Sequence, residues 1–154
     1  MVPMTFTLML TFVTTTVLSA RLMVIFFRWF GMNVGNSGGK SIADSLRTLD
    51  GVIAMLFMCG VVAPILEEYL CRALPMKFST GTTMMLVSSF IFALLHGIKN
   101  DKGEIVLPIP QFFLGLVFWH VALTYGLNQA IILHSLHNVV CVDGSFCSQS
   151  HPST

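Results

Sequence analysis

Charged side chains are scarce in this sequence. Only 8 Lys and Arg and 7 Asp and Glu occur among 154 residues, or 10% of the chain, whereas a soluble domain carries roughly 25%. Hydrophobic residues make up 55%, and the mean hydropathy is +0.81. This composition does not provide an ordinary water-facing surface, and it predicts an integral membrane protein.

Several common functional motifs are also missing. The formal net charge is only +1 and there is no basic stripe, so nothing favours a nucleic-acid partner. The four cysteines have no CxxC spacing, and the glycine-containing stretch 32–45 lacks the GxxxxGK[ST] pattern of a phosphate loop. No serine or cysteine stands in a recognisable pair with a base, so we do not expect an acyl-enzyme.

What the chain does contain is a series of apolar segments of membrane-spanning length. Val2–Ala20 could be a signal peptide, but apolar sequence continues through Leu22–Phe27 and no Lys or Arg precedes it, which favours a retained span. The predicted fold is all-α, a polytopic transmembrane bundle of about five spans. Its expected parts are an N-terminal span (1–30), a core (49–142) with helices near 49–74, 80–96, 109–125 and 128–142, loops at 32–45 and 99–104, and a polar tail (143–154).

The most informative stretch is Pro64–Pro75, which places Glu67, Glu68 and Arg72 inside apolar sequence. Charges near hydrocarbon are costly and usually face a protein interior or a water-filled cavity. On a helix Glu68 and Arg72 stand at i, i+4 and can pair, while Glu67 lies about 100° away and is left for chemistry. The alternative is a plain ion pair at the end of a membrane helix.

Two further polar groups lie in apolar helices downstream. His96 ends the segment Phe92-Ala-Leu-Leu-His96, where a single histidine is more often a structural hydrogen-bonding group. His134 and Asn138 stand at i, i+4 and project from one helix face, with His137 at its border. Two imidazoles and an amide in so short an apolar span are hard to explain by packing alone.

Taken together, these residues resemble a known family. Glu67-Glu68-x-x-x-Arg72, Phe92-x-x-x-His96 and His134-x-x-x-Asn138 are similar, in order, to the three motifs of the CAAX protease and bacteriocin-processing family, also called the Abi family of intramembrane proteases. The resemblance covers about Leu49 to Val142. It implies a membrane-embedded endopeptidase that cuts a membrane-tethered substrate, either a prenylated CAAX-type C-terminus or a leader or bacteriocin-type peptide.

Peptide hydrolysis gives each residue a predicted role. Glu67 is the expected general base that activates water, and His96 shares the proton or holds the water. His134 and Asn138 are expected to donate hydrogen bonds to the oxyanion. Arg72, paired with Glu68, is expected to orient the helix.

A metal-dependent mechanism of hydrolysis would use the same side chains. Glu67, His96 and His134 form a plausible zinc set with a position open for water, although the pattern is not HExxH. The resemblance supports both mechanisms, and we favour the metal-free one, without a required cofactor, because Asn138 suits an oxyanion hole better than a zinc shell. The alternative function is that of a non-enzymatic membrane transporter or scaffold, in which the Glu, Arg and His residues form a buried network.

Partners and location follow from the same reading. We expect contact with membrane lipid and a membrane-tethered peptide, in the cell membrane if the source is prokaryotic and in the endoplasmic reticulum if it is eukaryotic.

If all helices stand upright, Glu67 and His134 lie roughly 10 Å and 9 Å from one membrane face, but His96 lies roughly 24 Å from it. Strong tilt, a later helix start or a broken span would bring His96 to Glu67, and the sequence does not choose among these three.

Overall fold

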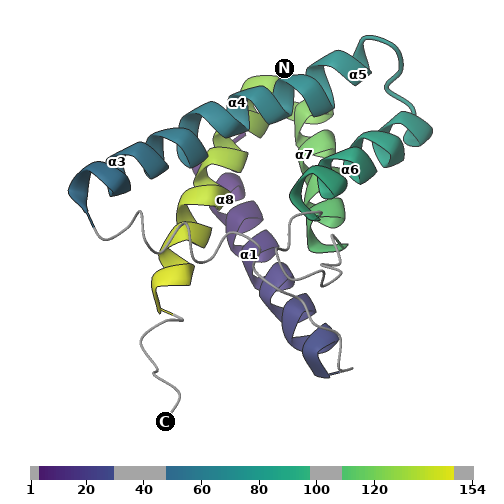
Figure 1. Cartoon of the computed structure of the whole chain (residues 1–154). Helices are drawn as coiled ribbons and strands as arrows, with labels where there is room; N and C mark the ends of the chain where they lie inside the picture. The colour runs from purple at the N-terminus through teal and green to yellow at the C-terminus, as the bar shows by residue number, and fades with distance from the viewer. Residues whose placement is uncertain (1–3, 30–47, 98–108, 148–154) are drawn as a thin grey trace.

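A computed structural model describes residues 4–29, 48–97 and 109–147. These residues form helices, and no strand occurs among them, which confirms the all-α class (Figure 1). The predicted loops 32–45 and 99–104 and the tail beyond 147 lie outside this part of the chain. The elements are α1 (Phe6–Trp29), α3 (Leu49–Phe57), η1 (Met58–Val62), α4 (Ala63–Glu68), η2 (Tyr69–Ala73), α5 (Leu74–Met76), α6 (Thr82–Gly97), α7 (Ile109–Tyr125) and α8 (Leu127–Cys147).

The helices lie close to the segments that hydrophobicity predicts, with one clear difference at the end of the chain. We expected the last helix to stop near Val142, but α8 continues to Cys147, five residues into the predicted tail. Extending an existing helix adds a hydrogen bond for each residue fixed, and residues 143–147 contain no proline to stop it.

The segment Leu49–Met76 is one continuous 28-residue helical rod interrupted by two π-helical turns. Thr48 caps its start, since its Oγ1 accepts the N–H of Gly51 at 3.2 Å. Each π turn, η1 and η2, ends two residues before a proline, Pro64 and Pro75 respectively. A proline ring clashes with the carbonyl four residues earlier, and a widened turn relieves that clash.

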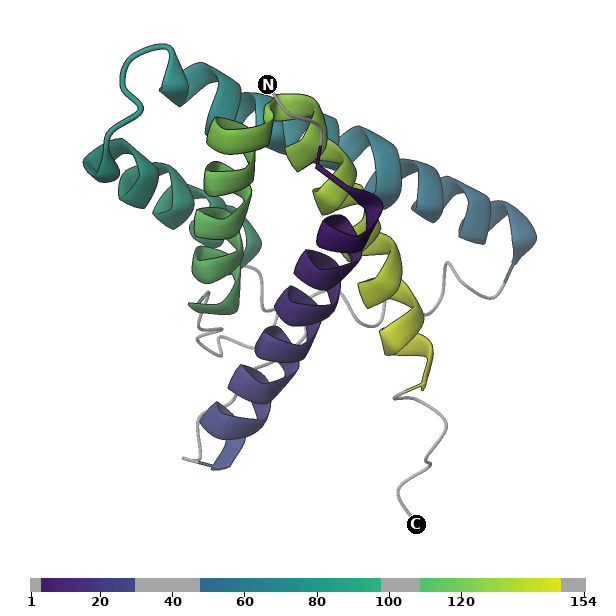
Figure 2. The same ribbon diagram turned by 180° about the vertical axis from the view of Figure 1, so that it is seen from behind.

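The rod crosses the other helices instead of running parallel to them. Figures 1 and 2 show it lying across one end of the group formed by α1, α7 and α8, with α6 returning beneath α5. The turn from α7 to α8 is made by Gly126, whose φ of 100° is a left-handed conformation that favours glycine. This turn reverses the chain and packs α8 against both α7 and the rod.

Helices α6 and α7 approach each other closely at a pair of small residues. A Cβ on Gly115 would come within 3.0 Å of the Cα and Cβ atoms of Ser89. Close approach at small residues is typical of helix packing in membranes. The contact brings the backbone of α7 next to α6, which matters for the site described below.

Large apolar side chains occur both in the interior of the bundle and on its outer surface, as expected for a membrane protein. Phe92, Phe118, Trp119 and Leu133 are at most 1% exposed, whereas large apolar side chains such as Phe57, Phe90 and Leu95 are more than half exposed. Within residues 4–29, 48–97 and 109–147, one helix, Leu49–Met76, is long and apolar enough to cross a membrane, and α6, α7 and part of α1 are shorter apolar helices. Outward-facing apolar side chains of this size suit a lipid environment.

The N-terminal helix is attached to the core by a polar contact. Thr16 Oγ1 on α1 lies 3.2 Å from Nδ1 of His137 on α8, and Thr16 also bonds to the carbonyl of Val13 at 3.0 Å. Met9 and Val13 on the same helix are buried in the hydrophobic core. Thus α1 packs as part of the bundle, and His137 faces α1.

Candidate active site

The adjacent glutamates of α4 have different surroundings. Glu68 is fully buried, with a side-chain exposure of 0%, whereas the Glu67 side chain is 25% exposed. Neighbouring residues on a helix point about 100° apart, so one turn can present one carboxylate to the interior and the other to an opening. Glu68 is therefore the more buried carboxylate of the two, and the role of Glu67 in chemistry stays a prediction.

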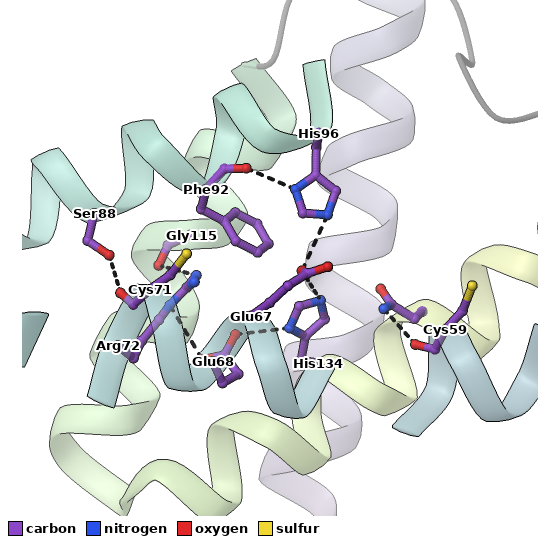
Figure 3. Close-up of polar contacts among 11 residues, drawn as sticks. Cys59, Glu67, Glu68, Cys71, Arg72, Ser88, Phe92, His96, Gly115 and His134 are labelled. Carbon is purple, nitrogen blue, oxygen red and sulfur yellow. Dashed lines mark hydrogen bonds and ion pairs between the residues drawn. The ribbon is translucent and has the colours of Figure 1, made fainter. Parts of the chain in front are cut away.

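Glu68 is held from two sides. Its Oε2 lies 3.4 Å from Nε of Arg72 one turn later, and its Oε1 lies 2.9 Å from Nδ1 of His134 on α8 (Figure 3). Arg72 is also fully buried and donates from Nη2 to the carbonyl of Gly115 at 3.2 Å. A buried ion pair of this kind connects the rod with α7 and α8, and losing either member would leave an uncompensated charge.

Glu67 faces two imidazoles. Its Oε2 lies 3.4 Å from Nε2 of His96 and 3.6 Å from Nε2 of His134 (Figure 3). The His96 side chain is 34% exposed and that of His134 is 1% exposed. The site thus has a buried part, Glu68, Arg72 and His134, and a more open part, Glu67 and His96.

The hydrogen bonds of the histidines assign their tautomers. Nδ1 of His96 lies 2.9 Å from the carbonyl of Phe92, and because a carbonyl can only accept, this nitrogen carries a proton. Nδ1 of His134 donates in the same way to the carboxylate of Glu68. In the neutral form of each ring the lone pair is therefore on Nε2, and both Nε2 atoms are directed at Glu67. The three side chains can share a proton.

Aromatic rings enclose this cluster. Phe118 stacks on His134 with ring centroids 4.5 Å apart, and Phe92 lies 4.5 Å from His96 and 5.6 Å from His134. The guanidinium of Arg72 lies over the Phe92 ring at 4.4 Å from its centroid. Aromatic faces attract cations and exclude water, which strengthens the electrostatic interactions inside.

The position of His96 corrects the estimate from upright helices. That estimate separated His96 from the other groups, but its Nε2 lies 3.4 Å from Glu67. The reason is the inclination of the helices, since the rod and α6 cross the bundle obliquely in both views (Figures 1 and 2). Position along a helix then no longer measures depth.

Asn138 lies one turn beyond His134 on α8, but its amide binds elsewhere. Nδ2 donates to the backbone carbonyl of Cys59 in η1 at 2.9 Å. The role as a second oxyanion donor stays a prediction.

Two contacts of the site were not foreseen from the sequence, the Gly115 carbonyl and the Phe118 ring. Nothing in an apolar run distinguishes the glycine or phenylalanine that meets an arginine from any other. Cys71, the residue before Arg72, is buried.

The fit of a metal can be judged from the same side chains. Among the residues that the structure describes, no group of three His, Cys, Asp or Glu side chains is arranged to hold a metal ion. Nδ1 of His134 is bound to Glu68 and Nδ1 of His96 to a carbonyl, so only their Nε2 atoms and Glu67 could serve as ligands. We therefore derive no chemical step through zinc.

Comparison with known proteins agrees with this geometry. No curated protein and no solved structure gives a match to the chain. A family model described as type II CAAX prenyl endopeptidase Rce1-like matches residues 49–140, which is more than half of the 154 residues. The matched segment contains all three motifs and every residue of the cluster, and it confirms the resemblance noted from the sequence. The chain therefore belongs to the Rce1-like family of type II CAAX prenyl endopeptidases.

Proposed function

We propose that this protein is an intramembrane endopeptidase that hydrolyses a peptide bond near a prenylated CAAX-type C-terminus, using water activated by Glu67. The observation that carries the proposal is the convergence of two imidazole Nε2 atoms on Oε2 of Glu67, at 3.4 and 3.6 Å. A carboxylate beside an imidazole nitrogen can take a proton from water and pass it on. Membership of the family supports the reaction class and the kind of substrate.

The proton has a defined route in this proposal. Glu67 removes a proton from the attacking water as the oxygen adds to the scissile carbonyl. His96 is the more exposed of the two imidazoles and, with its Nδ1 bound to the Phe92 carbonyl, takes the proton on Nε2. The proton then goes to the departing amine. The peptide C–N bond breaks, and the new carboxyl group contains the oxygen of the water.

His134 is proposed to stabilise the oxyanion that forms in the first step. Glu68 accepts from its Nδ1, and Phe118 stacks on the ring, so its orientation is constrained from two sides. In this proposal His134 has a proton on both ring nitrogens throughout the cycle, so its Nε2 donates a hydrogen bond to the oxyanion without taking the proton of the water, and one such preorganised donor contributes roughly 3 kcal/mol in known sites. Glu68 and Arg72 act behind His134 as positioning residues.

The location of the site suits a substrate that is itself in the membrane. Proteins of this family are integral membrane proteins, and here large apolar side chains cover the outside of the described helices. We propose a multi-pass arrangement of about five spans. A prenyl chain buries its apolar surface in lipid or between helices, and this brings the adjacent peptide bond to the level of the site.

The direct test uses purified protein in detergent or lipid with two peptides of the same sequence, one prenylated and one not. We expect cleavage of the prenylated peptide, seen as new fragment masses, and a much lower kcat/KM for the other. A leader-type peptide cut in preference to the prenylated one would change the proposed substrate. No cleavage of any peptide by folded protein would favour a non-enzymatic transporter or scaffold instead.

A further inference from the structure

His137 is a buried histidine of α8 that the proposed reaction does not use. Its Nδ1 lies 3.2 Å from Oγ1 of Thr16 on α1. The Thr16 hydroxyl donates its own proton to the carbonyl of Val13 at 3.0 Å, so towards His137 its oxygen acts as the acceptor. Nδ1 of His137 therefore carries a proton, and its hydrogen bond to α1 restrains the orientation of the ring.

Phe118 on α7 contacts both this ring and a ring of the active site. Its ring stacks on His134, with centroids 4.5 Å apart and an interplanar angle of 24°. It stands nearly perpendicular to His137, with centroids 6.3 Å apart and an angle of 83°. Both arrangements of aromatic rings are favourable, and a ring in a close-packed core does not turn without displacing its neighbours. The orientation of His137 thus constrains Phe118, and Phe118 constrains His134.

Helix α1 contacts the core mainly through its first half. Val13 belongs to the hydrophobic core of the bundle, whereas Leu22 and Ile25 are more than half exposed. In both views the second half of α1 diverges from α8 (Figures 1 and 2). Thr16 stands near the start of this divergence, where it makes its polar contact with α8. Since the family model matches residues 49–140, the match itself assigns no role to α1.

We propose that Thr16 and His137 are positioning residues, through which α1 keeps the oxyanion-binding ring of His134 in its orientation. The contacts run from Thr16 to His137, then to Phe118 and then to His134. A preorganised donor must point at the place where negative charge develops, so a small rotation of the His134 ring weakens it. The role involves no contact of Thr16 or His137 with the reacting atoms. The inference rests on the proposed function for its activity measurements, but the contact between α1 and α8 can be tested without a substrate.

The outer face of the same helix provides a matched control. Thr14 is exposed, and its hydroxyl donates to the carbonyl of Leu10 at 2.9 Å. Thr16→Val has nearly the shape of threonine but no hydroxyl. A displacement of about 1 Å at an active site can cost about 10²-fold in rate, and for a smaller rotation we expect kcat per folded molecule to fall roughly 5- to 20-fold with KM little changed. Thr16→Ser, which restores the hydroxyl, and Thr14→Val should both keep the wild-type kcat.

Two results of these measurements would overturn the positioning role. One is an equal kcat for Thr16→Val and Thr14→Val. The other is a lower unfolding midpoint in Thr16→Val with an unchanged kcat per folded molecule, which would make the contact structural only.

A double-mutant cycle tests the route through His137. His137→Phe keeps a ring beside Phe118 but has no N–H to donate to Thr16. In that background Thr16→Val should change kcat by less than about two-fold, because the hydrogen bond is already absent. The same fold loss in both backgrounds would show that Thr16 affects activity by another route, and the proposal would be wrong.

Nitrogen NMR of histidine-labelled protein in detergent measures the contact without a substrate. We expect wild-type His137, identified by the signals lost in His137→Phe, to carry a proton on Nδ1. These signals should shift in Thr16→Val and not in Thr14→Val. A proton on Nε2 alone would overturn the contact. If wild-type protein cleaves no peptide, the proposed function fails and the positioning role with it, while the NMR signals still decide whether Thr16 binds His137.

Discussion

Glu67 and Glu68 allow the same isosteric change to be made at adjacent residues with different expected effects. Replacing either carboxylate with glutamine preserves its size and removes its charge and basicity. Glu67 is the partly exposed member, facing two imidazoles, and Glu68 is the fully buried partner of Arg72. We expect Glu67→Gln to affect turnover and Glu68→Gln to affect stability first.

The expected sizes follow from these surroundings. Loss of a general base costs roughly 10²–10⁴-fold in rate, which corresponds to about 2.7–5.4 kcal/mol of activation free energy. Glu68→Gln leaves the guanidinium of Arg72 buried without its counter-charge, and breaking a buried pair costs roughly 3–5 kcal/mol of stability. At about 2–4 °C per kcal/mol, the unfolding midpoint would fall by roughly 6–20 °C. The two substitutions thus have similar energies but appear in different measurements.

The assay combines peptide cleavage with thermal unfolding of the same detergent-purified samples. Glu67→Gln should keep the wild-type midpoint and bind substrate normally while its kcat collapses. Glu68→Gln should unfold earlier, and its residual activity should track the folded fraction. Glu67→Gln activity within a few-fold of wild type would refute the assignment of Glu67 as the base, and an unchanged Glu68→Gln midpoint would refute the buried ion pair.

Three further predictions use independent measurements. Arg72→Lys keeps the charge but loses the planar fork that reaches both Glu68 and the Gly115 carbonyl; we expect lower yield or lower activity, and wild-type values of both would remove Arg72 from the site. Chelator treatment should leave cleavage unchanged in the metal-free mechanism; loss of activity with recovery on adding zinc would make Glu67, His96 and His134 ligands. The chain should stay with the membrane fraction after alkaline washing, because the rod Leu49–Met76 is too apolar to stand in water; recovery in the soluble fraction without detergent would contradict the membrane assignment.

Features that depend on near neighbours in the chain were accessible from the sequence. Low charge predicts the membrane class, and the apolar segments predict the helices to within a few residues at most ends. The i, i+4 spacing predicts the Glu68–Arg72 pair, which the structure contains at 3.4 Å. Helix geometry alone brings such residues together, so no tertiary information is needed.

Features that join different helices were not accessible in the same way. The sequence places His96 far from Glu67 if helices stand upright, and it does not indicate that Asn138 binds the carbonyl of Cys59. The contacts of Arg72 with the Gly115 carbonyl and of His134 with the Phe118 ring also depend on the angles at which helices cross. Those angles are set by side-chain packing along whole helices, such as the close approach of Gly115 and Ser89.

The chain by itself therefore determined which residues carry charge and which helix face presents them, since both depend on composition and on the period of 3.6 residues. Only the tertiary structure decided that both histidines point their Nε2 atoms at Glu67 and that His134 also binds Glu68. The physical reason is that a helix constrains its own residues within a turn or two. The meeting of side chains from the rod, α6 and α8 depends on how three separate surfaces pack.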